Sequence, residues 1–448
     1  MNDNPSTDDS PIESADRSAS KSTNTATKRS GLIVAAIFAV AALAVVVYLN
    51  AKSTFSMRWL DRANVAIESR QLDLADQYLD NAHQWSNRSG KVSLLRARVA
   101  RLKNDPANAR RFLTKARDEG ADRQTLEHEE TLIKAQTGRA RILIDQIESL
   151  INQSGEGAPY VLEAFALGFA SDRDYPAALD IVDRWLAVEP ESAMAHYRKG
   201  TFLQQTSRNE EAKKSLARAV ELNPQLTEAH FALARVAFAL QDDALALKHY
   251  RVVVAANPDN FAARMAKANL LLAMRKYDEA IEEFNWILER DSDNFSAQFN
   301  LASHYARHGE PQKTIDLLAD WNRKLPDDVA LNYLLANAHQ QLGDDQLSES
   351  FLQRHLEGRK ALDRLDTLTG QANSNLTDFE LRKHLGLGYL QYQWDSAQVW
   401  LTQANAMRPY DVDVLRGLAT YWQINGNEEF AKRYLESAER LQSSSPGN

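Results

Sequence analysis

A repeat with a period of 34 residues is the feature that most restricts how this chain can fold. Its markers stand near the end of each repeat, with a serine in the one position that lacks proline: Pro190, Pro224, Pro258, Ser292 and Pro326. Small residues recur in two further series at the same interval: Ala166, Gly200, Ala234, Ala268 and Ala302, and Ala178, Ala212, Ala246, Ala280 and Thr314. A fixed period of this size is typical of stacked repeats, in which one supersecondary unit recurs along the chain.

The residue types within each repeat predict a pair of antiparallel helices. A small side chain on the first helix opposite a small one on the second lets the two backbones approach closely. Larger apolar residues would fill the seam one turn away, and they keep the same interval: Val182, Leu216, Tyr250, Phe284 and Leu318. Proline ends the second helix, because it has no N–H to donate and disfavours a helical conformation in the preceding residue. The sequence therefore predicts an all-α solenoid of antiparallel helix pairs.

Residues 227–258, TEAHFALARVAFALQDDALALKHYRVVVAANP, resemble a tetratricopeptide repeat (TPR). The match rests on residue types at positions typical of the family: Leu233, Ala234, Ala246, Tyr250 and Pro258. Two groups of residues depart from the family, one where Trp is usual and one where Ala is usual: His196, His230 and Arg264, and Trp185 and Trp321. The resemblance implies a right-handed superhelix, with local repacking around the two tryptophans.

The repeat register divides the chain into blocks. We expect degenerate repeats over 56–157, a core array over 159–362, an insertion or loop over 363–377 and C-terminal repeats over 378–445. The segment 152–159 adds one residue to the period. Roughly eleven repeats fit in this register, and a polar outer face on the last helix would keep the end of the array soluble.

Residues 31–49, GLIVAAIFAVAALAVVVYL, are apolar throughout and predict a single transmembrane helix over 31–50. A helix of about 20 residues crosses a hydrocarbon core of about 30 Å. Residues 1–30 are polar, and we expect them to be disordered. A cleaved signal peptide is the alternative. The long acidic leader, the length of the apolar run and the lack of a small-x-small cleavage site favour an uncleaved anchor.

The charges that flank the apolar run bear on its orientation. Lys28 and Arg29 directly precede it and favour a cytoplasmic N-terminus. We therefore expect a single-pass protein of a bacterial inner membrane, with its repeats outside the cytoplasm. The cytoplasmic orientation of the repeats stays open, because Lys52, Arg58 and Arg62 follow soon after the run.

Several classes of function lack the residues that they need. The formal net charge is −8 and basic residues are spread along the chain, so the basic footprint of a nucleic-acid-binding protein is missing. The absence of cysteine excludes disulfides, thiolate catalysis and Cys-ligated zinc. There is no glycine-rich phosphate loop or nucleophile elbow. Acidic clusters such as Glu127, Glu129 and Glu130 fit solvated helix faces. We expect no cofactor and no catalytic site.

Histidines raise the question of a metal. His304 and His308 are four residues apart and would share one helix face, and His339 lies in the next repeat. No acidic third ligand stands beside them. Polar histidines with ordinary hydrogen bonds are therefore favoured over a metal site.

A row of aromatic and polar residues on the first helices predicts a binding groove. The apolar members are Tyr197, Phe231, Met265, Phe299 and Tyr333, and the polar neighbours are Arg198, Arg235, Asn269, Asn300 and Asn337. In the TPR family these positions line the concave surface, so the resemblance implies that they contact a peptide. Asparagine can both donate to and accept from a peptide backbone, and aromatic rings add contact area. Alternatively, the aromatics pack against the preceding repeat. The family's carboxylate clamp has Lys where Tyr197 stands and is not matched.

These observations favour a membrane-anchored TPR scaffold without catalytic activity of its own. It would bind peptide or protein partners in the concave groove, contact the lipid bilayer through residues 31–50, and support assembly of a membrane or envelope complex. Two alternatives stay open. One is a regulatory accessory subunit of an envelope enzyme or of a polysaccharide or protein export machine. The other is an enzyme whose chemistry lies in the insertion at 363–377, which is disfavoured because that segment lacks paired catalytic residue types.

Overall fold

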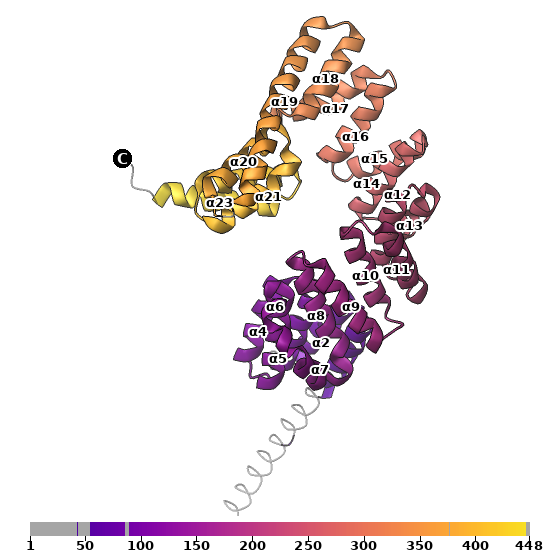
Figure 1. Ribbon diagram of the computed structural model, residues 1–448, viewed down its shortest axis with the longest axis vertical. Helices are drawn as coiled ribbons and strands as arrows, with labels where there is room; N and C mark the ends of the chain where they lie inside the picture. Colours follow the sequence, from indigo (N-terminus) through magenta and orange to yellow (C-terminus); the bar gives the residue numbers. More distant parts are fainter. Residues whose placement is uncertain (1–42, 44–53, 86–88, 376, 445–448) are drawn as a thin grey trace, which may run out of the picture. The chain divides into compact units, whose positions relative to one another are not determined.

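The structure, a computed structural model, describes residues 43, 54–85, 89–375 and 377–444. Within these residues the regular elements are helices, no strand is present, and the fold is an all-α solenoid of helical repeats (Figure 1). No helix among them is long and apolar enough to span a membrane. Apart from Leu43, the predicted tail at 1–30 and membrane helix at 31–50 lie outside the described residues.

The chain forms two compact units, Met1–Glu191 and Ser192–Asn448. In the first, a helix over 54–68 is followed by α2 (Leu72–Trp85), and α3 (Gly90–Leu102) by α4 (Pro106–Asp118). Next, α5 (Arg123–Lys134) is followed by a second helix broken into α6 (Ala140–Leu143) and α7 (Ile147–Ser154), with short π- and 3-10 turns at Ala135–Arg139, Ile144–Gln146 and Gly155–Gly157. The pair α8 (Ala158–Ser171) and α9 (Tyr175–Val188) ends the unit.

The second unit contains seven further helix pairs in chain order. They are α10 (Ala193–Gln205) and α11 (Asn209–Leu222), α12 (Thr227–Ala239) and α13 (Asp243–Ala256), α14 (Phe261–Ala273) and α15 (Tyr277–Leu288), and α16 (Phe295–Arg307) and α17 (Pro311–Lys324). They continue with α18 (Val329–Leu342) and α19 (Asp345–Ser374), α20 (Phe379–Tyr392) and α21 (Ala397–Met407) joined by a 3-10 turn at Trp394–Ser396, and α22 (Val412–Ile424) and α23 (Glu428–Ser444).

The turn inside almost every pair holds one residue with a left-handed backbone, and these residues keep the period. They are Arg70, Asn104, Gly138, Arg173, Ser207, Gln241, Arg275, Gly309, Gly343 and, in the last pair, Gly426. From Arg70 to Gly343, neighbours are 34 apart except for one interval of 35, from 138 to 173, which contains the extra residue predicted in 152–159. The interval from 343 to 426 is 83, which equals two periods of 34 plus 15 residues.

These left-handed residues close the first helix of each pair. At Arg70 the N–H donates to the Ile67 carbonyl at 3.1 Å, and the next N–H, of Gln71, donates to the Ala66 carbonyl at 2.8 Å. This is the hydrogen-bond pattern of a Schellman motif, which satisfies the last carbonyls of a helix. Because these bonds offset the strain, the turn accepts a residue other than glycine at φ near +60°.

The seam between paired helices is as close as the small residues predict. A Cβ on Gly200 would lie 2.4 Å from Cγ of Leu216 on the partner helix, so the two backbones leave no room for a side chain there. Thr314 replaces the usual alanine in the second series and is fully buried. Its hydroxyl donates across the seam to the Ala302 carbonyl at 3.1 Å, which satisfies the polar group. Trp185 and Trp321 are both buried, as their sites in the repeat require.

The prediction of a loop over 363–377 is wrong for most of the segment, because α19 continues as a helix to Ser374. Buried residues recur along α19 at intervals of seven: Phe351, Gly358, Leu365 and Ala372. This stripe faces first α18 and then α20, so burial of one face sustains the helix through a polar sequence. The 15 extra residues are thus a helical extension.

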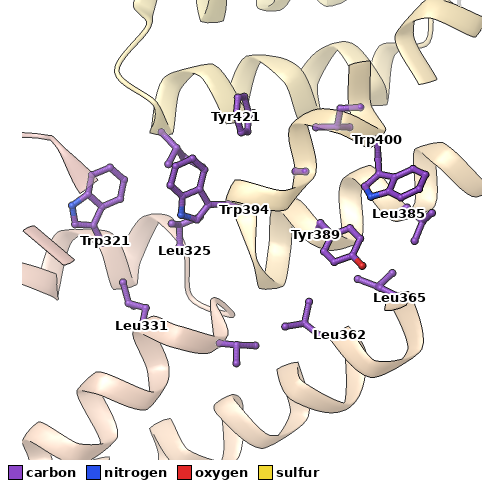
Figure 2. Close-up of a cluster of buried hydrophobic side chains, with 14 of the residues drawn as sticks. Trp321, Leu325, Leu331, Leu362, Leu365, Leu385, Tyr389, Trp394, Trp400 and Tyr421 are labelled. Atoms are coloured by element: carbon purple, nitrogen blue, oxygen red, sulfur yellow. The ribbon is translucent and has the colours of Figure 1, made fainter. Parts of the chain in front are cut away.

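The two helix pairs after this extension still share a core with the helices before it. The indole of Trp394 contacts the Phe295 ring edge-on at 5.4 Å. It also lies 5.8 Å from the Tyr421 ring (Figure 2). Gln391 Nε2 donates to Asp327 Oδ2 at 2.8 Å. Helix α16 and helix α22 therefore meet through one tryptophan.

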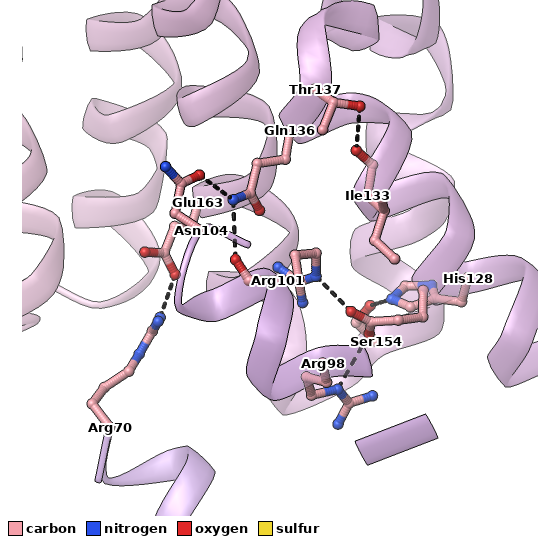
Figure 3. A network of polar contacts seen from close by, with 11 residues as sticks. Arg70, Arg98, Arg101, Asn104, His128, Ile133, Gln136, Thr137, Ser154 and Glu163 are labelled. Atoms are coloured by element: carbon pink, nitrogen blue, oxygen red, sulfur yellow. Dashed lines mark hydrogen bonds and ion pairs between the residues drawn. The ribbon is translucent and has the colours of Figure 1, made fainter. Parts of the chain in front are cut away.

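A buried polar network distinguishes the first unit (Figure 3). Glu129 accepts from Nε of Arg101 at 2.5 Å and Nε of Arg98 at 3.3 Å. Burial favours a higher pKa for the Glu129 carboxyl, but the two guanidinium groups outweigh it and hold the pKa below its ordinary value. The prediction that Glu129 belongs to a solvated face is therefore wrong, because its position on α5 faces α3.

The boundary between the two units differs from the predicted division at 157–159. Helix α8 packs tightly on earlier helices: a Cβ on Gly168 would lie 2.0 Å from the Ala135 carbonyl oxygen. Glu163 on α8 also accepts from Arg70 at 2.5 Å. These contacts place the pair α8 and α9 in the first unit, and the division falls at Glu191–Ser192.

Candidate binding groove

A groove of about 790 Å³ runs along two first helices of the second unit, α16 and α18. Its lining residues are Phe299, Ser303, Ala306 and Arg307 from α16, and Ala330, Tyr333, Leu334, Asn337, Gln340 and Gln341 from α18. Within each helix these residues recur every three or four positions and therefore share one face. The groove is thus built from the same face of two consecutive repeats.

Two capped helix starts position these faces. The side chain of Asn294 accepts the N–H of Ala297 at 3.0 Å, and that of Asp328 accepts the N–H of Leu331 at 2.9 Å. Each cap satisfies one N–H at the first turn and fixes where its helix begins. The register of the helix then places Phe299 and Tyr333 at equivalent positions.

The groove combines an exposed aromatic ring with polar groups that have few internal partners. Tyr333 is 49% exposed and touches the His355 ring at 5.2 Å between centroids. Phe299 is half-buried and stacks on Phe295 at 5.5 Å. The side-chain amide of Asn337 has no hydrogen-bond partner within 54–85, 89–375 and 377–444.

Other polar groups in the groove are engaged within the molecule. Arg307 Nη2 donates to Ser303 Oγ at 2.8 Å along α16. Gln341 Nε2 donates to the Ala306 carbonyl at 2.9 Å, which ties α18 to α16. Arg307 is the one lining residue with a formal charge. The surface therefore offers an aromatic ring, an amide and a single guanidinium group.

Three of the ten predicted site residues, Phe299, Tyr333 and Asn337, line this groove, and the other seven do not. Met265 and Asn300 contact each other, with Asn300 Nδ2 3.7 Å from the Met265 sulfur. The remaining five lie on α10, α12 and α14: Tyr197, Arg198, Phe231, Arg235 and Asn269. None of the ten is buried.

The aromatic ring of Phe231 shows how the row divides. It meets the Tyr250 ring edge-on at 5.8 Å and packs against two buried clusters of α12–α16. These contacts lie in its own repeat and the following ones, whereas the alternative expected packing against the preceding repeat. Arg198 covers the Tyr197 ring, with its Cζ 5.3 Å from the ring centroid.

Sequence reasoning missed several lining residues, among them Ser303, Arg307, Leu334 and Gln340. A signal existed for the first two. They stand four and eight positions after Phe299 and so follow the same helix face. Extending each predicted position by one and two helical turns would have found them.

The three histidines considered as metal ligands contact neighbouring groups of the protein. His304 is buried and stacks on His308 at 4.1 Å between ring centroids, and Nδ1 of His308 lies 2.8 Å from the His304 carbonyl. Burial lowers the pKa of His304. His339 contacts Asp344 and Phe351 instead. Among the described residues, no group of three or more His, Cys, Asp or Glu side chains could hold a metal ion.

Comparison with known proteins identifies part of the array. Residues 202–261 and 265–321 match the family model of the tetratricopeptide repeat. The matched segments make up about a quarter of the chain. They include α16 and most of α17, so one wall of the groove lies in the matched region. No curated protein matches the sequence.

Solved TPR structures resemble the chain at low sequence identity. A TPR protein from Parabacteroides merdae is 16% identical, with 63% of this chain and 98% of that chain covered and a TM-score of 0.38. Yeast Tom70 is 12% identical, with coverages of 87% and 92% and a TM-score of 0.34. YrrB, described as a TPR protein with an unusual peptide-binding site, is 20% identical, with coverages of 46% and 96% and a TM-score of 0.36. The family match supports a role as a protein-interaction scaffold.

Proposed function

We propose that the groove on α16 and α18 binds an extended peptide segment of a partner protein, and that the chain is a non-catalytic scaffold. The observation that carries the proposal is the groove itself, with the exposed Tyr333 ring beside the unpartnered amide of Asn337. An amide can donate to and accept from a peptide backbone at once. A tyrosine adds a large contact area and loses little conformational entropy on binding.

The chemistry of the lining limits the peptide. Phe299, Leu334 and the alanines of the groove suit an apolar side chain. Arg307 is the single charged group, so an acidic residue beside that apolar side chain would be favoured over a basic one. We therefore expect a short motif with one apolar anchor and a neighbouring acid.

We further propose that residues 31–50 anchor this scaffold in a membrane and that the repeats lie outside the cytoplasm. The support is the uninterrupted apolar run and the basic pair Lys28 and Arg29 before it. An anchored scaffold would hold its partner near the bilayer, as assembly of a membrane or envelope complex requires.

The groove is tested by selecting peptides from a displayed random library on the full chain in detergent and measuring their affinities by fluorescence anisotropy. Tyr333→Ala and Asn337→Ala should each weaken binding without loss of helix content. Truncation of an interface aromatic commonly costs about 2 kcal/mol, which is roughly thirtyfold in affinity.

The matched control is Phe231→Ala, at the register position of Tyr333 but three repeats earlier and packed against the core. It should lower stability and leave peptide affinity unchanged. If Tyr333→Ala and Asn337→Ala bind selected peptides as the parent does, the groove is not the binding site.

A further inference from the structure

Exposed apolar side chains of the first unit gather at its first helix pair. Within 54–191, six large hydrophobic residues are exposed, and four of them lie within 54–85: Phe55, Met57, Val65 and Trp85. The other two, Ile142 and Val188, lie on separate helices. A concentration of exposed apolar groups at one place on a repeat unit commonly marks an interaction surface.

The geometry of this surface brings aromatic rings and cations together. Phe55 and Trp85 are 43% and 38% exposed and stack on each other, with ring centroids 5.0 Å apart and planes 22° apart. Along the helix, Phe55, Arg58, Arg62 and Val65 follow at intervals of three or four residues and share one face. We name Phe55, Arg58, Arg62, Val65 and Trp85 the proximal face.

The two arginines of the proximal face lie against aromatic rings. Arg58 Cζ is 5.9 Å from the Phe55 ring centroid, and Arg62 Cζ is 4.8 Å from that of Trp59. Neither arginine forms an ion pair within the described part of the chain. Asp61 and Glu68 on the same helix bring the net formal charge of the helix to zero. The proximal face is therefore apolar and aromatic, with the two arginines as its charged groups.

The sequence places this face directly after the apolar run that ends at Leu49. Phe55 stands six positions after Leu49, with five residues between them. This stretch reaches about 9 Å if helical and at most about 20 Å if fully extended. Each headgroup layer of a bilayer is roughly 5–8 Å thick. If residues 31–49 cross a membrane, Phe55 and its stacking partner Trp85 are held at or just above the headgroups.

We propose that the proximal face rests on the headgroup layer of the bilayer, with the Phe55–Trp85 pair at the membrane interface and Arg58 and Arg62 against anionic lipid. Tryptophan is enriched at this depth because it presents an apolar body and one N–H donor. Basic residues near an anionic surface are attracted to it electrostatically. This inference rests on the proposed membrane anchor. It adds that the first unit is held against the membrane rather than free on a tether.

The absence of cysteine permits a direct test on the full chain. A nitroxide is attached at Gln84→Cys, an exposed site beside Trp85, and in a second protein at Asp118→Cys, an exposed site at the end of α4. Both proteins are reconstituted into phosphatidylcholine vesicles with and without phosphatidylglycerol. The label at residue 84 should be shielded from a water-soluble relaxant and reached by a headgroup-bound nickel chelate. The label at residue 118 should show the opposite.

Flotation of the same vesicles after alkaline carbonate treatment separates the two hypotheses. A chain that fails to float refutes the anchor, and with it the inference. A chain that floats while both labels are equally open to the aqueous relaxant refutes the docking alone. Shielding at residue 84 that grows with protein density in the vesicle would assign the face to a second copy and would also refute contact with lipid.

Two variants then test the chemistry. Joint replacement of Arg58 and Arg62 by Gln should abolish the difference between vesicles with and without phosphatidylglycerol, because only the charge is removed. Joint replacement of Phe55 and Trp85 by Ser should abolish shielding in both kinds of vesicle while flotation persists. Circular dichroism of each variant controls for helix content. Unchanged shielding in folded forms of both variants contradicts the proposed face.

Discussion

Replacement of Asp328 by Asn should stabilise the second unit at alkaline pH. Asp328 is the N-cap of α18, where its Oδ1 accepts the N–H of Leu331 at 2.9 Å, yet it is only 4% exposed. Burial raises its pKa to about 6, the capping N–H groups oppose that rise, and the nearby charge of Asp395 adds to it. The native state therefore holds an aspartate that is costly to ionise.

The sign and size of the effect follow from linkage. The folded pKa of about 6 exceeds the ordinary value of 3.8, so the native state binds the proton more tightly than the unfolded state does. Stability is full below pH 3.8 and falls as pH rises through 6. A difference of about 2.2 units at 1.36 kcal/mol per unit gives a loss on the order of 3 kcal/mol at pH 8, and about half of that at pH 5. Asparagine keeps the cap and cannot ionise, so Asp328→Asn should recover this loss.

Amide hydrogen exchange of α18 and α20 at pH 5 and pH 8 is the appropriate assay, because helical arrays open locally and do not unfold in one step. Protection in Asp328→Asn should exceed that of the parent, and the excess should grow with pH. The control is Asp378→Asn, the N-cap of α20, whose carboxylate accepts the N–H of Leu381 at 3.0 Å but is partly exposed. Equal protection of Asp328→Asn and the parent at pH 8, or a gain of the same size for Asp378→Asn, would refute the reasoning.

The remaining predictions concern a buried histidine, a helix seam and the shared core. Burial beside His230 lowers the pKa of His249 to about 4, below its ordinary 6.5. The free energy of unfolding should therefore fall as pH drops from 6.5 toward 4, and His249→Gln should reduce that pH dependence, measured as the urea midpoint. Gly200→Ala should cost about 1–3 kcal/mol by overpacking, and an unchanged melting curve would contradict the seam. Trp394→Ala should cost about 3–5 kcal/mol, appearing first as faster amide exchange in α20–α23.

The helix pairs could be predicted because their information is local and repeated. Gly200 allows close packing because it faces Leu216 on the adjacent helix. The 34-residue period of both series predicts that these two positions are paired. The left-handed turn residues confirm the same register, including the single added residue between Gly138 and Arg173. Both observations depend on contacts within one repeat or between adjacent repeats, which is why sequence spacing sufficed.

The helical extension of α19 could not be predicted from residue types. Its last turns contain Thr369 and Ser374, which usually favour turns. In the structure both hydroxyls donate back along the helix, Thr369 to the Leu365 carbonyl at 3.1 Å and Ser374 to the Gln371 carbonyl at 2.8 Å. The helix is stabilised because one of its faces is buried against α20. This contact joins two separate segments, so it cannot be predicted from the residues of either segment alone.

The repeat position of the groove residues could be predicted from the sequence, but not which repeats form the groove. The aromatic row was found because its members recur at one repeat position, yet of that row only Phe299 and Tyr333 line the groove on α16 and α18. Phe231 occupies the same register and packs on Tyr250 instead. Whether an aromatic ring turns toward a groove or toward its own helix pair depends on the size of its neighbours on the second helix. A repeat register alone does not rank those alternatives.

The row of aromatic residues on the first helices ends where α19 is extended, because an arginine takes the next position of the row. In α20, Arg382 stands at the repeat position that Tyr333 holds in α18, but it is buried. Its Nη1 donates to the carbonyls of Asn375 and Asp378 at 2.9 and 3.0 Å, and its Nη2 to the carbonyl of Ala372 at 3.0 Å. The carbonyls of Ala372 and Asn375 lie at and just beyond the end of the 30-residue helix, whereas that of Asp378 lies at the start of α20 and also accepts the Arg382 N–H at 3.4 Å. In α20, the repeat position of Tyr333 is therefore occupied by an arginine that pairs with the end of α19. The helical extension that shifts the last two helix pairs thus also ends the aromatic row.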